Sequence, residues 1–207
     1  MPAPYGFKPA DYGEDHEQLV ARRALRRITI DWKAPRQWRP SDEGPPLPST
    51  ERRPGFLYAL SWDHHLASRR ETIAYIGITE DLATRFLDHR RAKELLARKR
   101  KTFIAVGDVD FGRRVNPDDG TRRVIEELEH ILIWALWGDQ ELLNERKVLC
   151  MPGFGTRGGE AWHIMNTGYR FRGQMPREII YPWMLVKPGR NRASRAQVRS
   201  SGSAGAT

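Results

Sequence analysis

The sequence contains little sulfur and no long apolar run. A single cysteine, Cys150, among 207 residues excludes an intrachain disulfide and a zinc site built from several thiolates. The longest apolar run, residues 131–137, is much shorter than the ~18 residues that a helix needs to cross a bilayer. The first 17 residues are acidic and proline-rich and do not have the pattern of a signal peptide. We therefore expect a cytoplasmic protein without a membrane partner.

The net charge of +9 is unevenly distributed along the chain. Residues 1–54 carry ten basic and eight acidic side chains, residues 55–150 carry sixteen of each, and residues 151–207 carry nine and two. A basic arm beside a neutral core would attract a polyanion such as nucleic acid. A tail that only improves solubility is equally compatible with this charge distribution.

Hydrophobic periodicity predicts a small mixed α/β core. Strict alternation predicts two strands, over residues 55–61 and 72–78, joined by a long polar hairpin loop. A helix follows from Thr79 or Asp81 toward Leu96, and residues 102–109 form a third strand. A second helix starts at Thr121 and runs to about Trp137. This β-β-α-β-α order predicts a small sheet with helices packed on it.

Two extensions flank the core. Residues 1–54 are expected to form an N-terminal helix, over residues 14–27, followed by an arm with five prolines between residues 32 and 53. Residues 148–187 are expected to pack on the core as a C-terminal extension, and within them residues 162–181 interleave aromatic and arginine side chains. Residues 188–207 are rich in Gly, Ser and Arg, which is typical of a disordered basic tail.

Glu129 is the residue that periodicity singles out. At about 100° per residue it falls inside the apolar face that Leu128, Leu132 and Leu136 share on the second helix. A buried carboxylate costs several kcal/mol, roughly, unless a cation compensates it. One carboxylate, water and a substrate phosphate are typical ligands of Mg²⁺. The alternatives are a structural ion pair with Arg85 and a helix register that differs from the predicted one.

Four other side chains complete a candidate constellation. Arg85 and His89 are four residues apart, so they are expected on one helical face, where an arginine can bind a phosphate and a histidine can relay a proton. Tyr58 and Tyr75 lie on the two facing strands. Taken singly, each tyrosine would be interpreted as a packing residue. To act as a base near neutral pH, a tyrosine needs nearby positive charge to lower its pKa from about 10.

In this order the motifs resemble the signature of the GIY-YIG nucleases. The resemblance covers roughly residues 55–147 and rests on Leu57-Tyr58, on Tyr75-Ile76-Gly77, on the arginine ten residues after Tyr75, on the helix that contains Glu129, and on Leu143-Asn144. The pair Arg85 and His89 is similar to the arrangement in homing and restriction members. The resemblance implies a small three-stranded antiparallel sheet flanked by helices as the nuclease domain over 55–147.

The resemblance also implies a function and a role for each motif residue. It implies a divalent-metal-dependent endonuclease whose products carry 5′-phosphate and 3′-hydroxyl ends. Our leading hypothesis is that it cuts DNA, most simply duplex DNA, in the context of restriction or phage defence, mobile-element spread or a delivered toxin. The cofactor would be one Mg²⁺ (or Mn²⁺). The implied roles are general base for Tyr58, support of its proton network for Tyr75, phosphate binding for Arg85, assistance for His89, metal ligand for Glu129 and site geometry for Asn144.

The sequence departs from the family pattern in two ways. The first motif lacks the family's glycine, and sixteen residues separate the two tyrosines, more than in short members. The longer loop carries His64 and His65, which either approach the substrate or remain solvated. Because neither departure removes a reactive side chain, we expect activity.

Basic side chains outside the constellation are candidates for nucleic-acid contacts or simply for a solvated surface. These candidates are Arg90, Arg91, Lys93, Arg98, Lys99, Arg100, Lys101, Arg170 and Arg172. One active site cuts one strand, so cleavage of a duplex needs a homodimer or two visits. Two alternatives remain: a non-catalytic nucleic-acid-binding module, and a toxin or phosphodiesterase directed at RNA or branched DNA.

Overall fold

The structure of the chain is a computed structural model. It describes residues 25–39, 41–42, 55–63, 71–98, 101–112, 121–136, 142–145, 147, 161–181, 184–187 and 189. Most of the expected helix over 14–27 lies outside these residues, as do His64, His65 and all of the expected disordered tail except Gly189.

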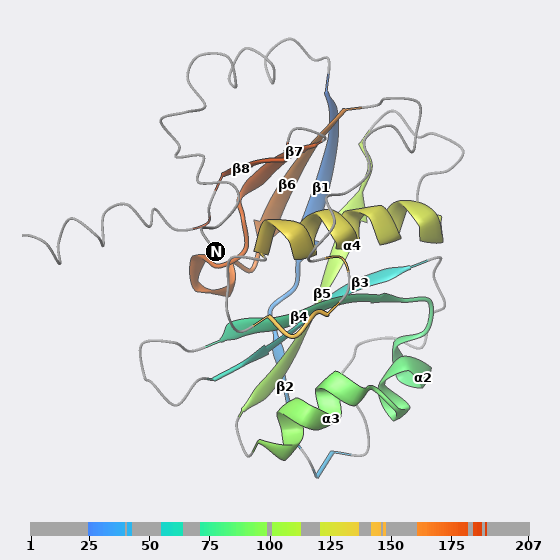
Figure 1. Cartoon of the computed structure of the whole chain (residues 1–207), viewed down its shortest axis with the longest axis vertical. Helices are drawn as coiled ribbons and strands as arrows, with labels where there is room; N and C mark the ends of the chain where they lie inside the picture. The colour runs from blue at the N-terminus through green and yellow to red at the C-terminus, as the bar shows by residue number, and fades with distance from the viewer. Residues whose placement is uncertain are drawn as a thin grey trace, which may run out of the picture.

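The described residues form eight strands, three α-helices and one 3₁₀ helix (Figure 1). In chain order they are β1 (Arg26–Trp32), β2 (Arg36–Trp38), β3 (Phe56–Trp62), β4 (Thr72–Thr79), α2 (Leu82–Leu87), α3 (Arg90–Ala97), β5 (Thr102–Asp110), α4 (Arg122–Leu136), β6 (Trp162–Gly168), η2 (Phe171–Gly173), β7 (Glu178–Tyr181) and β8 (Leu185–Lys187). Among these elements, no helix is long and apolar enough to cross a membrane.

All eight strands belong to one curled, mixed sheet with the order β4-β3-β5-β1-β6-β7-β8, in which β2 also pairs with β5. Strands β3, β4 and β5 pair antiparallel, as expected for the core. The prediction of a small three-stranded sheet flanked by helices is nevertheless wrong, because β1 continues the sheet beyond β5 and pairs in parallel with β6. The C-terminal strands β7 and β8 then extend it further.

The misjudged element is β1. In this strand Ile28, Ile30 and Trp32 are buried and alternate with more exposed residues, which is the period of two expected for a strand with one buried face. The end of the predicted 14–27 helix and its apolar member Ile28 belong to this strand instead. The residues before β1 suggest a helix by their composition. The alternation of period two that begins at Arg26 covers too few residues to show from the sequence where the helical pattern ends and the strand begins.

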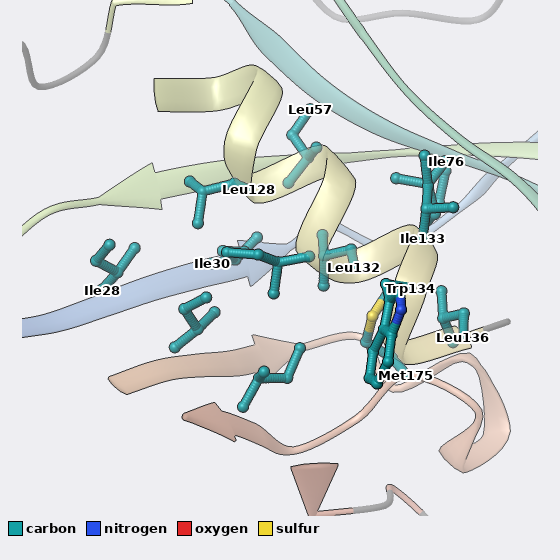
Figure 2. Close-up of a cluster of buried hydrophobic side chains, with 14 of the residues drawn as sticks. Ile28, Ile30, Leu57, Ile76, Leu128, Leu132, Ile133, Trp134, Leu136 and Met175 are labelled. Atoms are coloured by element: carbon teal, nitrogen blue, oxygen red, sulfur yellow. The ribbon is translucent and has the colours of Figure 1, made fainter. Parts of the chain in front are cut away.

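Helices cover both faces of the sheet. On one face, α4 packs against Leu57 and Ile76, and Figure 2 shows its Leu128 and Leu132 within the same buried cluster as Ile30 of β1. On the other face, α2 and α3 pack through Leu82, Phe86 and Leu95 onto the side of β3 that carries Tyr58. The sheet therefore separates the layer that contains Glu129 from the layer that contains Tyr58.

The helix predicted from Thr79 toward Leu96 is two helices. The Asp81 side chain caps α2 by accepting a hydrogen bond from the Thr84 N–H, and α2 ends at Leu87. His89 then caps α3, because its ring Nδ1 accepts a hydrogen bond from the Ala92 N–H at 3.2 Å. The prediction that Arg85 and His89 share the face of one helix is therefore wrong. They lie on either side of a break at Asp88.

The outer edge of β4 is covered by residues 142–145 and Lys147, which we call the edge segment. The Asn144 side chain accepts a hydrogen bond from the Ile76 N–H at 3.0 Å and donates one to the Ile76 carbonyl at 2.8 Å. The Leu143 N–H donates to the Ala74 carbonyl at 2.6 Å. An uncovered edge strand exposes unpaired backbone groups to other chains. The edge segment satisfies these groups and fixes its own position beside Tyr75.

This pairing makes Asn144→Asp destabilising although the side-chain shape is kept. One carboxylate oxygen replaces the amide N–H and faces the Ile76 carbonyl, so a hydrogen bond becomes a repulsion. We expect a loss of about 1–3 kcal/mol in the free energy of unfolding, measured by urea denaturation at pH 7. The control Glu145→Gln, at an exposed position in the same segment, should cost no more than about 1 kcal/mol. Equal stability of Asn144→Asp and the parent protein would show that the edge pairing is not needed.

Candidate active site

The two phenols of the signature meet over a glycine. Tyr58 is fully buried on β3, Tyr75 is half-buried on β4, and their ring centroids are 6.2 Å apart. Gly77 lies opposite Tyr58 in the β3–β4 register. A Cβ at Gly77 would come within 2.5 Å of the Tyr58 Oη and 2.6 Å of the Tyr75 ring. Only glycine leaves room for both rings, so this position is required for the phenol pair.

His89 is held against the Tyr58 hydroxyl. Its Nε2 lies 2.8 Å from the Tyr58 Oη, its side chain is buried, and its ring stacks on Phe86 at a centroid distance of 5.1 Å. Because Nδ1 accepts the Ala92 N–H, the proton of the neutral ring must reside on Nε2. His89 therefore donates to the Tyr58 oxygen. In this geometry it supports negative charge on Tyr58 and does not remove the tyrosine's proton.

The electrostatics of His89 agree with this tautomer. Burial and the nearby Arg85 charge lower the pKa of His89 from its usual 6.5 to about 4. The imidazole is therefore neutral at pH 7 and needs its one N–H for Tyr58. The expectation that His89 assists is retained as a proposal, with the role of a fixed donor.

Arg85 lies at the exposed side of the phenol pair. Hydrogen bonding and charge interaction with the two phenols, Tyr58 first, raise the pKa of Arg85. The Arg85 side chain is exposed, whereas Tyr58 is buried and Tyr75 is half-buried. A permanently charged fork with one side on the phenols and the other toward solvent suits the binding of a phosphate.

Both phenols are protonated at neutral pH in this structure. Burial is the largest cause that raises the pKa of Tyr58 and of Tyr75, and Arg85 opposes it without cancelling it. The sequence led us to expect that Arg85 would lower the pKa of Tyr58. The guanidinium does act in that direction, but the low polarity around a fully buried ring outweighs it.

Glu129 is buried in α4 and has a cation as its partner. Its side chain is 11% exposed, and the Lys147 Nζ lies 2.5 Å from one carboxylate oxygen. Burial raises the pKa of Glu129, and Lys147 counteracts part of that rise. The ion-pair partner of Glu129 is thus Lys147 and not Arg85, the partner that the sequence suggested as an alternative. The Glu129 charge also raises the pKa of Tyr58 and of Tyr75, which places the carboxylate within electrostatic range of both phenols.

The described side chains could offer a metal ion one carboxylate, that of Glu129, but not a site in which several protein ligands surround the ion. Among the described residues, no group of three or more His, Cys, Asp or Glu side chains could enclose a metal. Both ring nitrogens of His89 are engaged, so His89 is not a ligand. Glu129 already stabilises one positive charge at close range. A divalent ion bound here would have one carboxylate as its protein ligand and would take its other ligands from water and substrate, which is a coordination that Mg²⁺ accepts.

Most of the basic candidates already have acidic partners. The described pairs are Arg90–Glu145, Arg91–Glu145, Arg91–Glu94, Lys93–Asp88, Arg98–Glu94 and Arg172–Glu71. Lys101 and Arg170 are exposed, and Lys99 and Arg100 lie outside the described residues. A phosphate at Arg90 or Arg91 would have to replace the Glu145 carboxylate.

Two contributors to the site were missed in the sequence. Glu145 and Lys147 follow Asn144 in the edge segment, and they contact α3 and α4 respectively. Neither lies in a periodic pattern, because a segment that covers a strand edge has no regular period of its own. The sequence did offer one signal. Because Asn144 was predicted to belong to the site, Glu145 and Lys147, which follow it closely in the chain, could have been expected near the site as well.

The buried His89 makes stability depend on pH. Its folded pKa of about 4 is below the value of 6.5 in the unfolded chain, so between these values the unfolded chain binds a proton that the folded chain excludes. This contribution to stability is complete above pH 6.5 and is lost as the pH falls toward 4. Urea denaturation at pH 7 and pH 5 should show the loss, and His89→Gln should reduce it.

Nitrogen-15 NMR of the imidazole tests the same site directly. The expected signals at pH 6 are those of a neutral ring with the proton on Nε2. A ring that is charged at pH 6, or that carries its proton on Nδ1, would contradict the assignment.

Known proteins supply no relative on which to base a function. No family model matches the sequence, and no curated protein or solved structure is detectably similar to it. The function proposed for the chain therefore depends on its own side chains.

Proposed function

We propose that the chain is a divalent-metal-dependent endonuclease that hydrolyses phosphodiester bonds in DNA. The observation that carries the proposal is the cluster of Tyr58, Tyr75 and the neutral His89, in which both phenols also feel the charges of Arg85 and of the buried Glu129. The Tyr58 hydroxyl lies 2.8 Å from the His89 Nε2, and Arg85 and Glu129 influence both tyrosines electrostatically.

Tyr58 is the proposed base that activates the attacking water. Its oxygen accepts hydrogen bonds from the His89 Nε2–H and from Arg85, and both favour the phenolate. To act as a base, Tyr58 must first release its own proton to solvent, since both nitrogens of His89 are engaged. Because burial holds the pKa of Tyr58 high, the phenolate needs additional positive charge close by. Tyr75 shares the Arg85 guanidinium and supports this network.

Arg85 binds the scissile phosphate through its exposed side. Negative charge grows on the phosphate oxygens during attack by water, and a fixed guanidinium stabilises that charge. When bound at Glu129, Mg²⁺ or Mn²⁺ supplies polarisation of the phosphate and neutralisation of the leaving group. Attack by water with departure of the 3′ oxygen leaves a 5′-phosphate and a 3′-hydroxyl.

The proposal predicts that Tyr58→Phe, Arg85→Ala and Glu129→Ala lose most cleavage of plasmid DNA in Mg²⁺. Tyr58→Phe removes the proposed base, and the other two changes remove the proposed phosphate ligand and metal ligand, so a loss of roughly 10²–10⁴-fold in rate is expected for each. Tyr181→Phe is the matched control, because Tyr181 is also a buried strand tyrosine but donates to Glu127, outside the phenol pair. Its cleavage rate should equal that of the parent protein, and circular dichroism should show that all variants are folded.

The same assay separates the alternatives. Parallel digestion of duplex DNA, single-stranded DNA, branched DNA and RNA identifies the substrate class. Sequencing of the ends from a long mixed-sequence DNA gives end chemistry and specificity, including a restriction or defence context. A parent protein that binds DNA but cuts no nucleic acid with any divalent ion would be a binding module and would overturn the proposal. Cleavage by Tyr58→Phe at the parental rate would remove Tyr58 from the mechanism.

A further inference from the structure

Lys147 occupies the carboxylate to which the metal is assigned. Its ammonium lies 2.5 Å from the Glu129 Oε2 and 3.3 Å from the backbone carbonyl of Glu126, one turn earlier in α4. About 30% of the Lys147 side chain is exposed, whereas the Glu129 side chain is 11% exposed. The lysine therefore approaches a buried acid from the solvent side, the direction from which a hydrated ion would also arrive.

The backbone holds Lys147 in this position. The edge segment is anchored on β4 by the paired hydrogen bonds of Asn144 to Ile76. At Lys147 itself φ is 67°, in the left-handed region that residues other than glycine seldom adopt. Strained backbone of this kind is concentrated at functional sites, where the surrounding structure maintains it.

Two cations cannot share this one carboxylate at full strength. Like charges a few ångströms apart repel strongly where water is scarce, and Glu129 has a single negative charge to offer. A divalent ion at Glu129 must therefore displace the ammonium or bind weakly beside it. The lysine stem is long and flexible, so displacement requires no change in the backbone.

We propose that Lys147 is an exchangeable counter-ion that leaves Glu129 when the metal binds and then pairs with a phosphate of the substrate. This inference rests on the proposed function. In the free protein Lys147 weakens metal binding, because the ion must displace it. When DNA is present, a phosphate accepts the displaced ammonium, so that metal and DNA each strengthen the binding of the other. The free protein thereby keeps Glu129 paired until both are present.

The test measures the affinity for Mn²⁺, by calorimetry, in a Tyr58→Phe background that does not consume its substrate. Titrations are made without DNA and with a short duplex. With Lys147 present, the duplex should raise Mn²⁺ affinity about tenfold. Lys147→Met should bind Mn²⁺ about tenfold more tightly without DNA, and the duplex should then add little.

Three controls accompany these titrations. Lys147→Arg keeps the charge and should behave as its parent, which also covers the case in which Lys147→Met fails to fold. Lys33→Met removes a lysine whose ion-pair partners are Asp31 and Asp108 rather than Glu129, and it should change nothing. Glu129→Gln should abolish the Mn²⁺ binding that is being measured.

The outcomes separate this inference from the proposed function. Equal Mn²⁺ affinity for Lys147→Met and its parent, with Glu129→Gln still abolishing binding, would make Lys147 a structural partner only and leave the proposed function standing. The same conclusion would follow if Lys147→Arg lost the coupling to DNA together with Lys147→Met. Mn²⁺ binding that survives Glu129→Gln would overturn the metal site itself.

Discussion

The candidate site depends on how the outer edge of β4 is satisfied. This strand has a sheet neighbour on one side only, and the edge segment supplies its other hydrogen bonds. Below one face of the sheet lies α3, and above the other lies α4. From the same short segment, Glu145 pairs with Arg90 of α3 and Lys147 pairs with Glu129 of α4. Covering one strand edge thus ties together two layers that the sheet keeps apart.

A second constraint is the balance of charge. The phenols and the imidazole are all kept neutral at pH 7, since burial moves the pKa of each away from its charged form. Among the described residues, the buried carboxylate of Glu129 is matched by Lys147, and Arg85, which acts on both phenols, is exposed. Under the proposed function, such a site would have little negative charge to repel a phosphate, and a bound divalent cation would add the positive charge that the chemistry needs. Stability requires that the buried Glu129 carboxylate has a positively charged partner, whereas the proposed chemistry requires that the carboxylate is available to a metal. In our proposal Lys147 meets both requirements, because it pairs with Glu129 and can be displaced.

The sequence was informative where a regular period makes burial readable. Glu129 stood out because it interrupts an apolar helical face, and the phenol strands stood out because they alternate. Their conformations are local, so the structure of β3, β4, β5 and α4 agrees with the predictions. Period alone could not show that β1 and β6 join the sheet, because their pairing is between residues more than one hundred positions apart. Nor could it show the break before His89, since the capping bond to Ala92 competes with a helical pattern that continues on both sides.

The central claim is that one divalent cation is held by Glu129 beside the phenols and the guanidinium. Anomalous diffraction from crystals of the protein soaked in Mn²⁺, with a duplex bound, tests this most directly. The account predicts one manganese peak at coordination distance from the Glu129 carboxylate, with the scissile phosphate between the ion and Arg85. A manganese ion bound elsewhere, with Glu129 still paired to Lys147 while DNA is cut, would contradict it.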